Sequence, residues 1–503
     1  MKTANRILTT RNVSAFIVVI AVVSYFIVPG LRDLLKKKND VVTYEKSIAV
    51  LPFLNLSNDP GQEYFSDGLT DGILNSLAHL NGLKVSARTS SFRFKGKDVD
   101  IKDVGKKLGV HTVLEGSVQR QGDRVRITAQ LINVEDDFHF WSEQYDEKMD
   151  DIFVLQDKIA RAIADKLEIT LLENEGRTPV QKHSPGKEAY DLYLKGRSSW
   201  NLRTPPELKK GIEFFGQAIK LDPLYASAYS GIAVCYTALG YASFLSPKDA
   251  FPKALEAATK ALELDTTLAE PHASLGYYKF YYEWDWAAAE QEFRSALALN
   301  PNYEVGYDWY GYYLTAMKRY EEARIILKKA AELDPLSVPI NTDIGFSFYY
   351  SGDYDNAIKQ LHASLKMNPK FGLTHLWLGR SYQQKKMYTQ AIDEYKNTLQ
   401  CIVDWPVALA ALGHVYGVSG AKAEARKILD TLHLLSSKKF VTSYGFALVY
   451  AGLDEKEQAF QWLNKAFEEH SCWLVWLKTD PRWEPLSSDK RFAELVHRVG
   501  LPD

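Results

Sequence analysis

Side chains that could carry chemistry are few in this chain of 503 residues. Asp136, Asp137, His139 and Glu143 lie close enough in sequence to act as metal ligands. No second histidine follows at helical spacing, however, and surface polarity explains these residues equally well. The stretches SFRFKGKD and DVGKKLG contain glycine and lysine without the GxxxxGK[ST] order that wraps phosphates. We therefore predict no metal and no cofactor for this protein.

Catalytic signatures and nucleic-acid signatures are also missing. The sequence contains no GxSxG, no HExxH and no GxGxxG after a predicted strand, which argues against an enzyme. The 61 Lys and Arg residues nearly balance 63 Asp and Glu residues, whereas a nucleic-acid-binding domain should be strongly basic. Cys235, Cys401 and Cys472 lie far apart in sequence and form no CxxC pair, so they predict neither a disulfide framework nor a zinc site.

The charge is unevenly distributed, because residues 1–40 carry a net charge of +5 and the remainder carries −7. Within this arm, residues 13–31 form an uncharged apolar run, which at about 1.5 Å per residue nearly crosses a bilayer core of about 30 Å. We predict a basic segment at 1–12, a single transmembrane anchor at 13–31 and a basic tether at 32–43. A cleaved signal peptide is the alternative, although no small-x-small cleavage site closes the run.

Residues 44–172 are predicted to form a small α/β domain with a mixed sheet. The apolar run SIAVLPFLNLS is typical of a buried strand, and a helical stripe and a short strand around Leu83–Ala87 follow it, which is a βαβ unit with parallel pairing. A helix near 101–108 precedes two alternating strands, 112–118 and 125–134, joined as a hairpin through QRQGDR. The stretch HFWSEQYDE is expected at an edge, and an amphipathic helix closes the domain.

This region resembles a known bacterial domain. The stretches SIAVLPFLNLSNDPGQEYFSDGLTDGI, VSARTSSFRFKGKDVDIKDVGKKLGVHTVLEGSV and ITAQLINVEDDFHFWSEQYDEKMDDIFVLQDKIARAIADKL resemble the amino-terminal domain of TolB. The resemblance covers about a quarter of the chain. In relatives this domain stands beside tetratricopeptide repeats, and often beside a winged-helix or a nucleotide cyclase domain. It implies a bacterial envelope or regulatory setting rather than an activity.

A period of 34 residues runs through the second half of the chain, after a polar linker at 173–188. The recurring positions are Pro301, Pro335 and Pro369; Gly311, Gly345, Gly379 and Gly413; and Ala323, Ala357, Ala391, Ala425 and Ala459. Small residues let paired helices cross closely, and proline ends each second helix. The pattern resembles a tetratricopeptide array, an all-α superhelical solenoid of about eight repeats over 189–471.

Two repeats depart from the period, and a tryptophan-rich segment follows the last one. The second repeat carries an insertion around YASFLSPKDAFP, and the third holds one extra residue near Glu283–Trp286. Residues 472–503 resemble the closing segment of such arrays, and we expect Trp473, Trp476 and Trp483 to cover the exposed end of the solenoid.

Solenoids of this kind bind partners on the concave face, which the first helix of each repeat forms. The repeat register points nine side chains toward that groove: Asp308, Tyr312, Thr342, Phe346, Tyr349, Arg380, Gln383, His414 and Tyr444. The mixture of aromatic and hydrogen-bonding groups favours a protein partner or an extended peptide. The alternative role for each of these aromatics is packing between repeats.

These features predict a non-enzymatic, membrane-tethered scaffold or adaptor for protein–protein interactions. The alternative is a regulatory or sensor protein of the type associated with adenylate cyclases or transcription regulators, acting on a separate output protein. Three basic residues precede the predicted anchor and four follow it, so the positive-inside rule has little to act on. The resemblance to anchored envelope proteins favours the bacterial inner membrane, with a single pass and a periplasmic soluble part.

Overall fold

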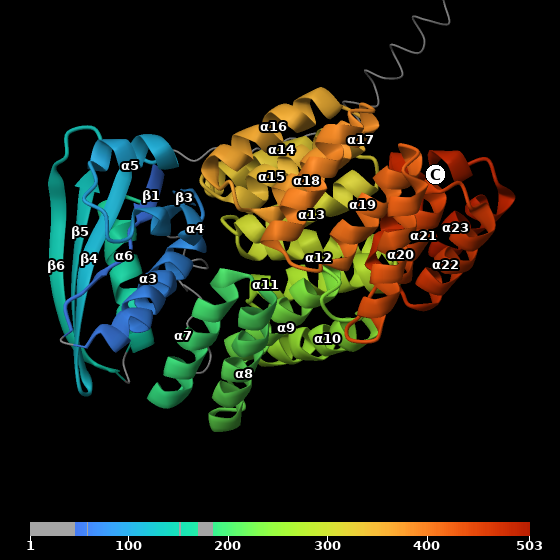
Figure 1. The fold of residues 1–503 in the computed structure, drawn as a ribbon. Helices are drawn as coiled ribbons and strands as arrows, with labels where there is room; N and C mark the ends of the chain where they lie inside the picture. The colour runs from blue at the N-terminus through green and yellow to red at the C-terminus, as the bar shows by residue number, and fades with distance from the viewer. Residues whose placement is uncertain (1–45, 58, 150–151, 170–184, 503) are drawn as a thin grey trace, which may run out of the picture. The chain divides into compact units, whose positions relative to one another are not determined.

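The computed structural model describes residues 46–57, 59–149, 152–169 and 185–502, which belong to one compact unit (Figure 1). A small domain with a mixed sheet comes first, and an all-helical array follows, as the sequence predicted. The predicted segments 1–12, 13–31 and 32–43 lie outside the described residues, as does most of the 173–188 linker. Within the described ranges, no helix is long and apolar enough to span a bilayer.

The sheet joins a parallel part to an antiparallel part. Its strands lie in the order β3 (Leu83–Val85), β1 (Lys46–Val50), β4 (Thr112–Gln121), β5 (Arg124–Asn133) and β6 (His139–Lys148), and β2 (Leu54–Asn55) also pairs with β4. Strand β1 pairs in parallel with both β3 and β4, whereas β4, β5 and β6 pair antiparallel. The predicted βαβ unit, the hairpin and the edge strand are therefore confirmed.

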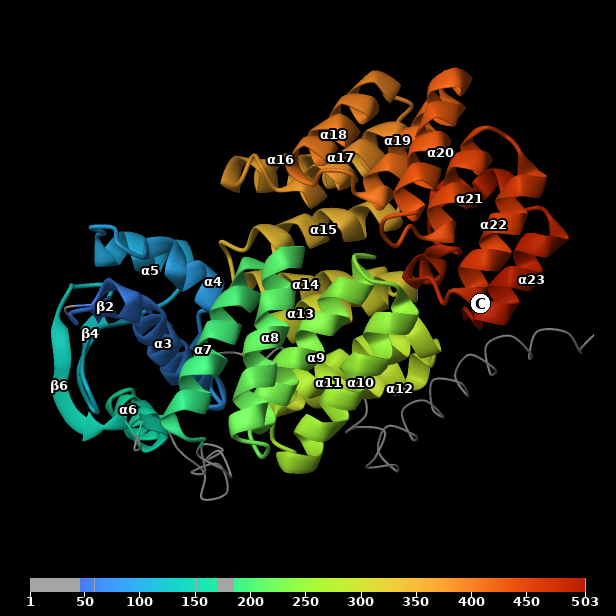
Figure 2. The same cartoon turned by 60° about the horizontal axis from the view of Figure 1, so that its bottom comes forward.

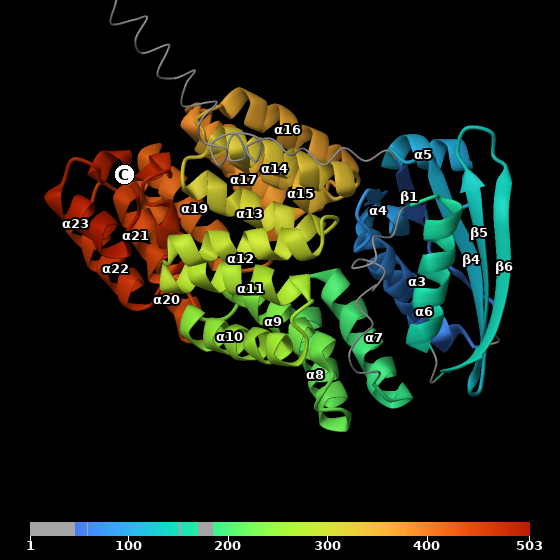
Figure 3. The same cartoon turned by 180° about the vertical axis from the view of Figure 1, so that it is seen from behind.

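Helices cover the two faces of this sheet unequally. The α3 helix (Glu63–Ala78) and the α6 helix (Ile152–Lys166) lie on one face, where Ile48 and Val50 of β1 join their core (Figure 3). The alternate residues Ala49 and Leu51 point to the other face, where α5 (Ile101–Leu108) packs. Short helical turns at η1 (Pro60–Gln62), α4 (Arg88–Ser91) and η2 (Phe92–Phe94) connect these elements. The domain thus has two small cores, one on each face.

The array consists of eight antiparallel helix pairs within the described residues. They are α7 (Lys187–Leu202) with α8 (Pro205–Leu221), α9 (Ala226–Tyr241) with α10 (Pro247–Leu264), α11 (Ala269–Tyr278) with α12 (Trp286–Leu299), α13 (Glu304–Ala316) with α14 (Tyr320–Leu333), α15 (Val338–Tyr350) with α16 (Tyr354–Met367), α17 (Gly372–Gln384) with α18 (Tyr388–Cys401), α19 (Pro406–Val418) with α20 (Lys422–Ser436), and α21 (Ser443–Gly452) with α22 (Lys456–Glu468). After them come η5 (Cys472–Trp476), η6 (Pro481–Leu486) and α23 (Lys490–Val499). Figure 2 shows α7, the first helix of the array, beside α3 of the sheet domain.

The periodic glycines lie where paired helices cross, which is the role their spacing predicted. A Cβ atom at Gly345 would lie 2.7 Å from the Leu361 side chain, and one at Gly379 would lie 2.7 Å from the Tyr395 ring. Both distances are shorter than any ordinary carbon–carbon contact. The periodic alanines, such as Ala357 and Ala391, are completely buried on the opposing helices.

The two irregular repeats absorb their extra residues in different ways. In the third repeat, α11 continues into a π-helical turn over Lys279–Glu283, which ends at Trp284 with φ of 60°. A π turn accommodates one additional residue without breaking the helix. In the second repeat the insertion forms a loop between α9 and α10. In that loop, the backbone oxygen of Ala242 accepts a hydrogen bond from Trp405 Nε1 at 3.3 Å, and the Phe244 ring stacks on Trp405.

Replacing Gly379 by alanine is expected to destabilise the array by about 1–3 kcal/mol, because the new methyl group would overlap Tyr395 and approach the Ala391 backbone oxygen. Gly216, in α8, provides the matched control, since nothing lies within 4 Å of a Cβ atom there. Gly216→Ala should be neutral or stabilise by up to about 1 kcal/mol. Urea unfolding followed by circular dichroism measures both, and equal effects of the two substitutions would contradict the crossing role.

Candidate functional site

The nine predicted groove residues do lie together on the first helices of the repeats, but all of them are buried. They belong to α13, α15, α17, α19 and α21, and none is more than 6% exposed: Asp308, Tyr312, Thr342, Phe346, Tyr349, Arg380, Gln383, His414 and Tyr444. A free peptide groove would expose such side chains to solvent. Contacts between neighbouring repeats bury some of them, as the packing alternative predicted, and a later segment of the chain covers others.

The covering segment is residues 471–486, which we call the terminal insert. Its Trp476 ring stacks on Tyr350 with centroids 4.5 Å apart and meets Phe346 edge-on at 5.1 Å. Trp473 donates a hydrogen bond through Nε1 to Ser243 Oγ at 3.2 Å, in the insertion loop of the second repeat. The three tryptophans were expected to cover the exposed end of the solenoid; Trp473 and Trp476 instead contact the second repeat and α15.

A buried ion pair anchors the second half of the terminal insert. Asp480 and Arg482 have fully buried side chains, with Arg482 Nη2 2.5 Å from Asp480 Oδ2. The hydroxyls of Tyr349 and Tyr444 each donate to the Asp480 carboxylate at 3.4 Å. Burial alone would raise the pKa of Asp480, but the charge and hydrogen bonds of Arg482 outweigh it and hold that pKa below its usual value. Trp483 Nε1 donates to the Tyr444 hydroxyl at 2.7 Å.

Arg380 and His414 are placed for packing rather than for catalysis. The Arg380 guanidinium lies 4.2 Å from the centroid of the Trp377 ring and 5.1 Å from that of Trp473, while its Nε and Nη1 atoms make no hydrogen bond. His414 Nδ1 lies 2.8 Å from Gln383 Nε2. Burial lowers the pKa of His414 to about 3, so its imidazole is neutral at physiological pH.

The remaining groove residues form a hydrogen-bonded polar row. Tyr312 donates through its hydroxyl to Asp343 at 2.6 Å, and the hydroxyls of Thr342 and Thr374 lie 2.6 Å apart. Burial raises the pKa of Asp308 to about 7, although the positive charge of Arg203 opposes the shift. The neighbouring Asp343 also has a raised pKa, first because of burial and then because of Asp308. The two carboxyl groups together therefore hold a proton near neutral pH.

Asp480→Asn is expected to lower the free energy of unfolding by about 3–5 kcal/mol, because it leaves the fully buried Arg482 without its counter-charge. The control is Asp489→Asn, at the exposed cap of α23, where Asp489 pairs with Arg491 at 2.8 Å. Asparagine retains that cap, so the control should cost about 1 kcal/mol or less. Chemical denaturation compares the two, and similar small losses would contradict the anchoring role of the buried pair.

Asp308→Asn is expected to make stability less dependent on pH. With a folded pKa of about 7 against an ordinary value of 3.8, the carboxyl contributes stability that is complete below about pH 4 and is lost as pH rises through 7. Asparagine has no proton to release. The free energy of unfolding should therefore fall less between about pH 5 and pH 8 in the variant than in the wild type, with exposed Asp393→Asn as the control. Identical slopes would show that Asp308 does not titrate in this range.

A second candidate site lies where the sheet domain meets the array. The Asn302 side chain, in the loop before α13, accepts a hydrogen bond from the Val85 backbone amide and donates to the backbone oxygens of Ala78 and Leu83. The backbone amide of Ala87 donates to the Leu333 oxygen at 2.8 Å. These bonds fix β3 against two successive inter-repeat loops.

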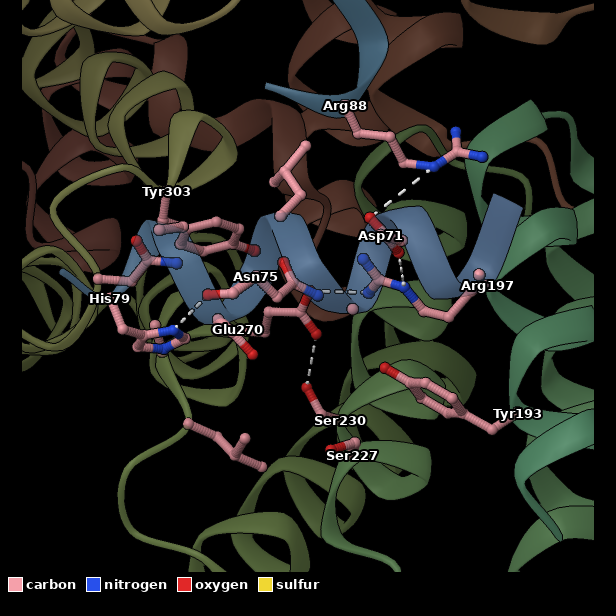
Figure 4. Close-up of a pocket in the computed structure, with 18 of the residues that line it drawn as sticks. Asp71, Asn75, His79, Arg88, Tyr193, Arg197, Ser227, Ser230, Glu270 and Tyr303 are labelled. Carbon is pink, nitrogen blue, oxygen red and sulfur yellow. Dashed lines mark hydrogen bonds and ion pairs between the residues drawn. The ribbon is translucent and has the colours of Figure 1, made fainter. Parts of the chain in front are cut away.

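Beside this contact is a cavity of about 240 Å³ lined by both parts of the protein (Figure 4). Asp71 and Asn75 of α3 and His79, the residue that caps this helix, line it along one stripe, because residues four apart share a helix face. Tyr193 and Arg197 line it from α7. Residues from α9, α11 and the loop before α13 complete the wall.

Charged side chains of both signs form a chain across this cavity. Arg88 Nε lies 3.8 Å from Asp71 Oδ1, and Arg197 Nε lies 3.5 Å from Asp71 Oδ2. Arg197 Nη1 donates to Glu270 at 2.7 Å, and Ser230 donates to the other oxygen of Glu270 at 3.1 Å (Figure 4). Burial lowers the pKa of Arg88, whereas the charge of Glu270 outweighs burial at Arg197 and raises its pKa well above the ordinary value.

Sequence spacing alone does not reveal this cavity, since its residues come from segments as far apart as α3 and α13. One local signal was available. Gly68 and Gly72 alternate with the polar stripe of α3, and Cβ atoms there would lie within 2.4 Å of Leu194 and 2.3 Å of Gln156. The group of Asp136, Asp137, His139 and Glu143 lies elsewhere, at the β5–β6 turn and along β6. The described residues include no cluster that could hold a metal ion.

Family models agree with the two-part architecture. Two models described as tetratricopeptide repeats match residues 306–335 and 342–401. The array is therefore a tetratricopeptide-repeat array, as its period predicted. A model described as the second domain of HilA/YgeH-like transcriptional regulators matches residues 44–162. That description differs from the TolB domain to which the sequence stretches were likened.

Two curated relatives share about half of this chain. "Putative adenylate cyclase 3" of Rhizobium meliloti (strain 1021) is 36% identical over 237 residues, which are 46% of this chain and 39% of that protein. "Transcriptional regulator HilA" of Salmonella typhimurium is 26% identical over 263 residues, which are 52% of this chain and 40% of that protein. The chain thus spans about two fifths of the length of each of these relatives.

Solved structures resemble the helical array. The pilF structure from Pseudomonas aeruginosa has a TM-score of 0.33 at 22% identity and covers 42% of this chain and 93% of that chain. The APC/C hetero-tetramer Cut9–Hcn1 has a TM-score of 0.43 at 18% identity and covers 70% of this chain and 63% of that chain. Both likenesses concern the fold alone.

Proposed function

We propose that this protein is a non-enzymatic scaffold that binds a protein segment through its tetratricopeptide array. The observation that carries the proposal is the array itself, whose repeats the family models match. Solenoids present extended surfaces suited to peptide and protein partners. The proposed partner surface includes the concave-face residues, among them Tyr349, Arg380 and Tyr444.

The terminal insert competes with the partner in this proposal. It presents aromatic rings and a carboxylate to the concave face, through Trp476 and Asp480, and these are groups that a partner segment could also present. A partner that uses the concave face must therefore displace residues 471–486. Substitution of Tyr349 or Arg380 would be a poor test, because both side chains are almost completely buried and their loss would also disturb packing.

Affinity capture of the full chain from solubilised membranes tests the proposal, with Asp480→Asn as the informative variant. Loosening the terminal insert should increase the yield of a stoichiometric protein partner several-fold, while Asp489→Asn should leave the yield unchanged. An equal yield from all three proteins would contradict binding on the concave face. Absence of any stoichiometric partner would count against the scaffold itself.

A regulatory or sensory role is the second candidate, and the two curated relatives favour it. One is named an adenylate cyclase and the other a transcriptional regulator, and the aligned part is about two fifths of each. We propose that this shared part regulates an output protein. Loss of the gene should then change the activity or expression that this output controls, and unchanged expression profiles would argue against the role.

Membrane attachment is part of the same proposal and rests on the uncharged run at residues 13–31. With that run as an anchor, the proposed location is the bacterial inner membrane, with a single pass and a periplasmic soluble part. Protease added to intact spheroplasts should digest the array if this is correct. Full protection of the array would refute the periplasmic placement.

A further inference from the structure

The cavity between the sheet domain and the array contains arginine donors that the protein itself leaves unsatisfied. The Nε atoms of Arg88 and Arg197 are both buried and make no hydrogen bond. Each faces the Asp71 carboxylate, at 3.8 and 3.5 Å, which are distances of ion pairs rather than of good hydrogen bonds. A buried charged donor without an acceptor is costly. A ligand oxygen beside these two guanidinium groups would supply the missing acceptor.

The same cavity offers negative charge next to Arg197. Glu270 lies at the start of α11, with its side chain 28% exposed, and it accepts hydrogen bonds from Arg197 and Ser230. A carboxylate has about four lone-pair sites, so Glu270 keeps acceptor capacity for a further donor. The rings of Tyr193 and Tyr303 lie on either side of this group (Figure 4).

Size and net charge narrow the class of ligand. The volume of about 240 Å³ is below the roughly 300–1,000 Å³ typical of pockets for drug-sized ligands, which favours a smaller ligand. Within the charged chain itself, Arg88 and Arg197 balance Asp71 and Glu270 in charge, while Arg203, Asp157, Asp265 and Glu304 line other parts of the cavity. A ligand with a net charge would upset that balance in a desolvated place, whereas a ligand that carries both charges would not.

We propose that this cavity binds a small zwitterion of amino-acid type, with its carboxylate at Arg88 and Arg197 and its ammonium group at Glu270. Because α3 and α4 of the sheet domain and α7, α9 and α11 of the array all line the cavity, the ligand contacts both parts of the protein. Occupancy of the cavity therefore depends on the concentration of this small molecule around the protein. Ligand binding here is separate from partner binding on the concave face, since none of the nine groove residues lines this cavity.

Isothermal titration of the purified full chain with each of the twenty common amino acids tests the proposal. At least one amino acid should bind saturably, and its deaminated acid and its decarboxylated amine should each bind about tenfold more weakly or worse, because each lacks one charged contact. No binding of any amino acid up to about 10 mM, a level far weaker than ordinary ligand affinities, would overturn the proposal. Equal binding of the deaminated acid would show an anion site instead, and equal binding of the amine a cation site.

Two substitutions assign the contacts. Arg88→Gln should weaken binding of the amino acid about tenfold. Arg93→Gln, at an exposed position in the following turn η2, should leave the affinity unchanged. Glu270→Gln preserves the size of the side chain and should reduce the preference for the amino acid over its deaminated acid. Thermal unfolding of each variant without ligand checks that the fold is retained. An unaltered preference in a folded Glu270→Gln protein would contradict the assigned ammonium contact.

Discussion

Asp480 and Arg482 neutralise one another inside the concave face of the array, and this pairing lets a polar turn of the chain lie among aromatic rings. Either charge alone would be strongly disfavoured there. With both present, Tyr349 and Tyr444 direct their hydroxyls at the carboxylate while Trp476 and Trp483 fill the space on either side. The concave face of this solenoid therefore has the character of a protein core.

The terminal insert also connects repeats that are remote in sequence. Trp473 reaches Ser243 in the insertion loop of the second repeat, and Cys472 Sγ lies 3.6 Å from the Gly240 backbone oxygen. The same loop contacts Trp405, ahead of α19. In an ordinary solenoid each repeat contacts only its neighbours. Here long-range contacts add to the nearest-neighbour ones, so unfolding should be more cooperative than in an open array.

Local sequence patterns predicted the elements well because the forces that create them are local. Gly345 and Gly379 indicate close helix crossings, and QRQGDR indicates a hairpin whose turn contains Gly122 with φ of 61°. Tyr312, Phe346 and Arg380 lie on the first helices of their repeats, where the register put them, and all three are buried. The repeat register could not predict which segment covers these residues, since Tyr349 and Asp480 are 131 residues apart in sequence. The cavity between the sheet domain and the array was not predicted for the same reason. Its acidic and basic groups come together only after both domains have folded.

The three hydrogen bonds of Asn302 bear on how the sheet domain can be combined with other domains. Strand β3 is an outer strand of the sheet; Asn302 satisfies backbone groups of Val85 and Leu83 on it, and Leu333 satisfies the Ala87 amide just after it. Unpaired strand edges invite association with other chains. A sheet domain separated from its helical array would present this edge to solvent and would tend to aggregate. A unit that keeps this edge covered therefore joins the sheet domain to the repeats that supply Asn302 and Leu333.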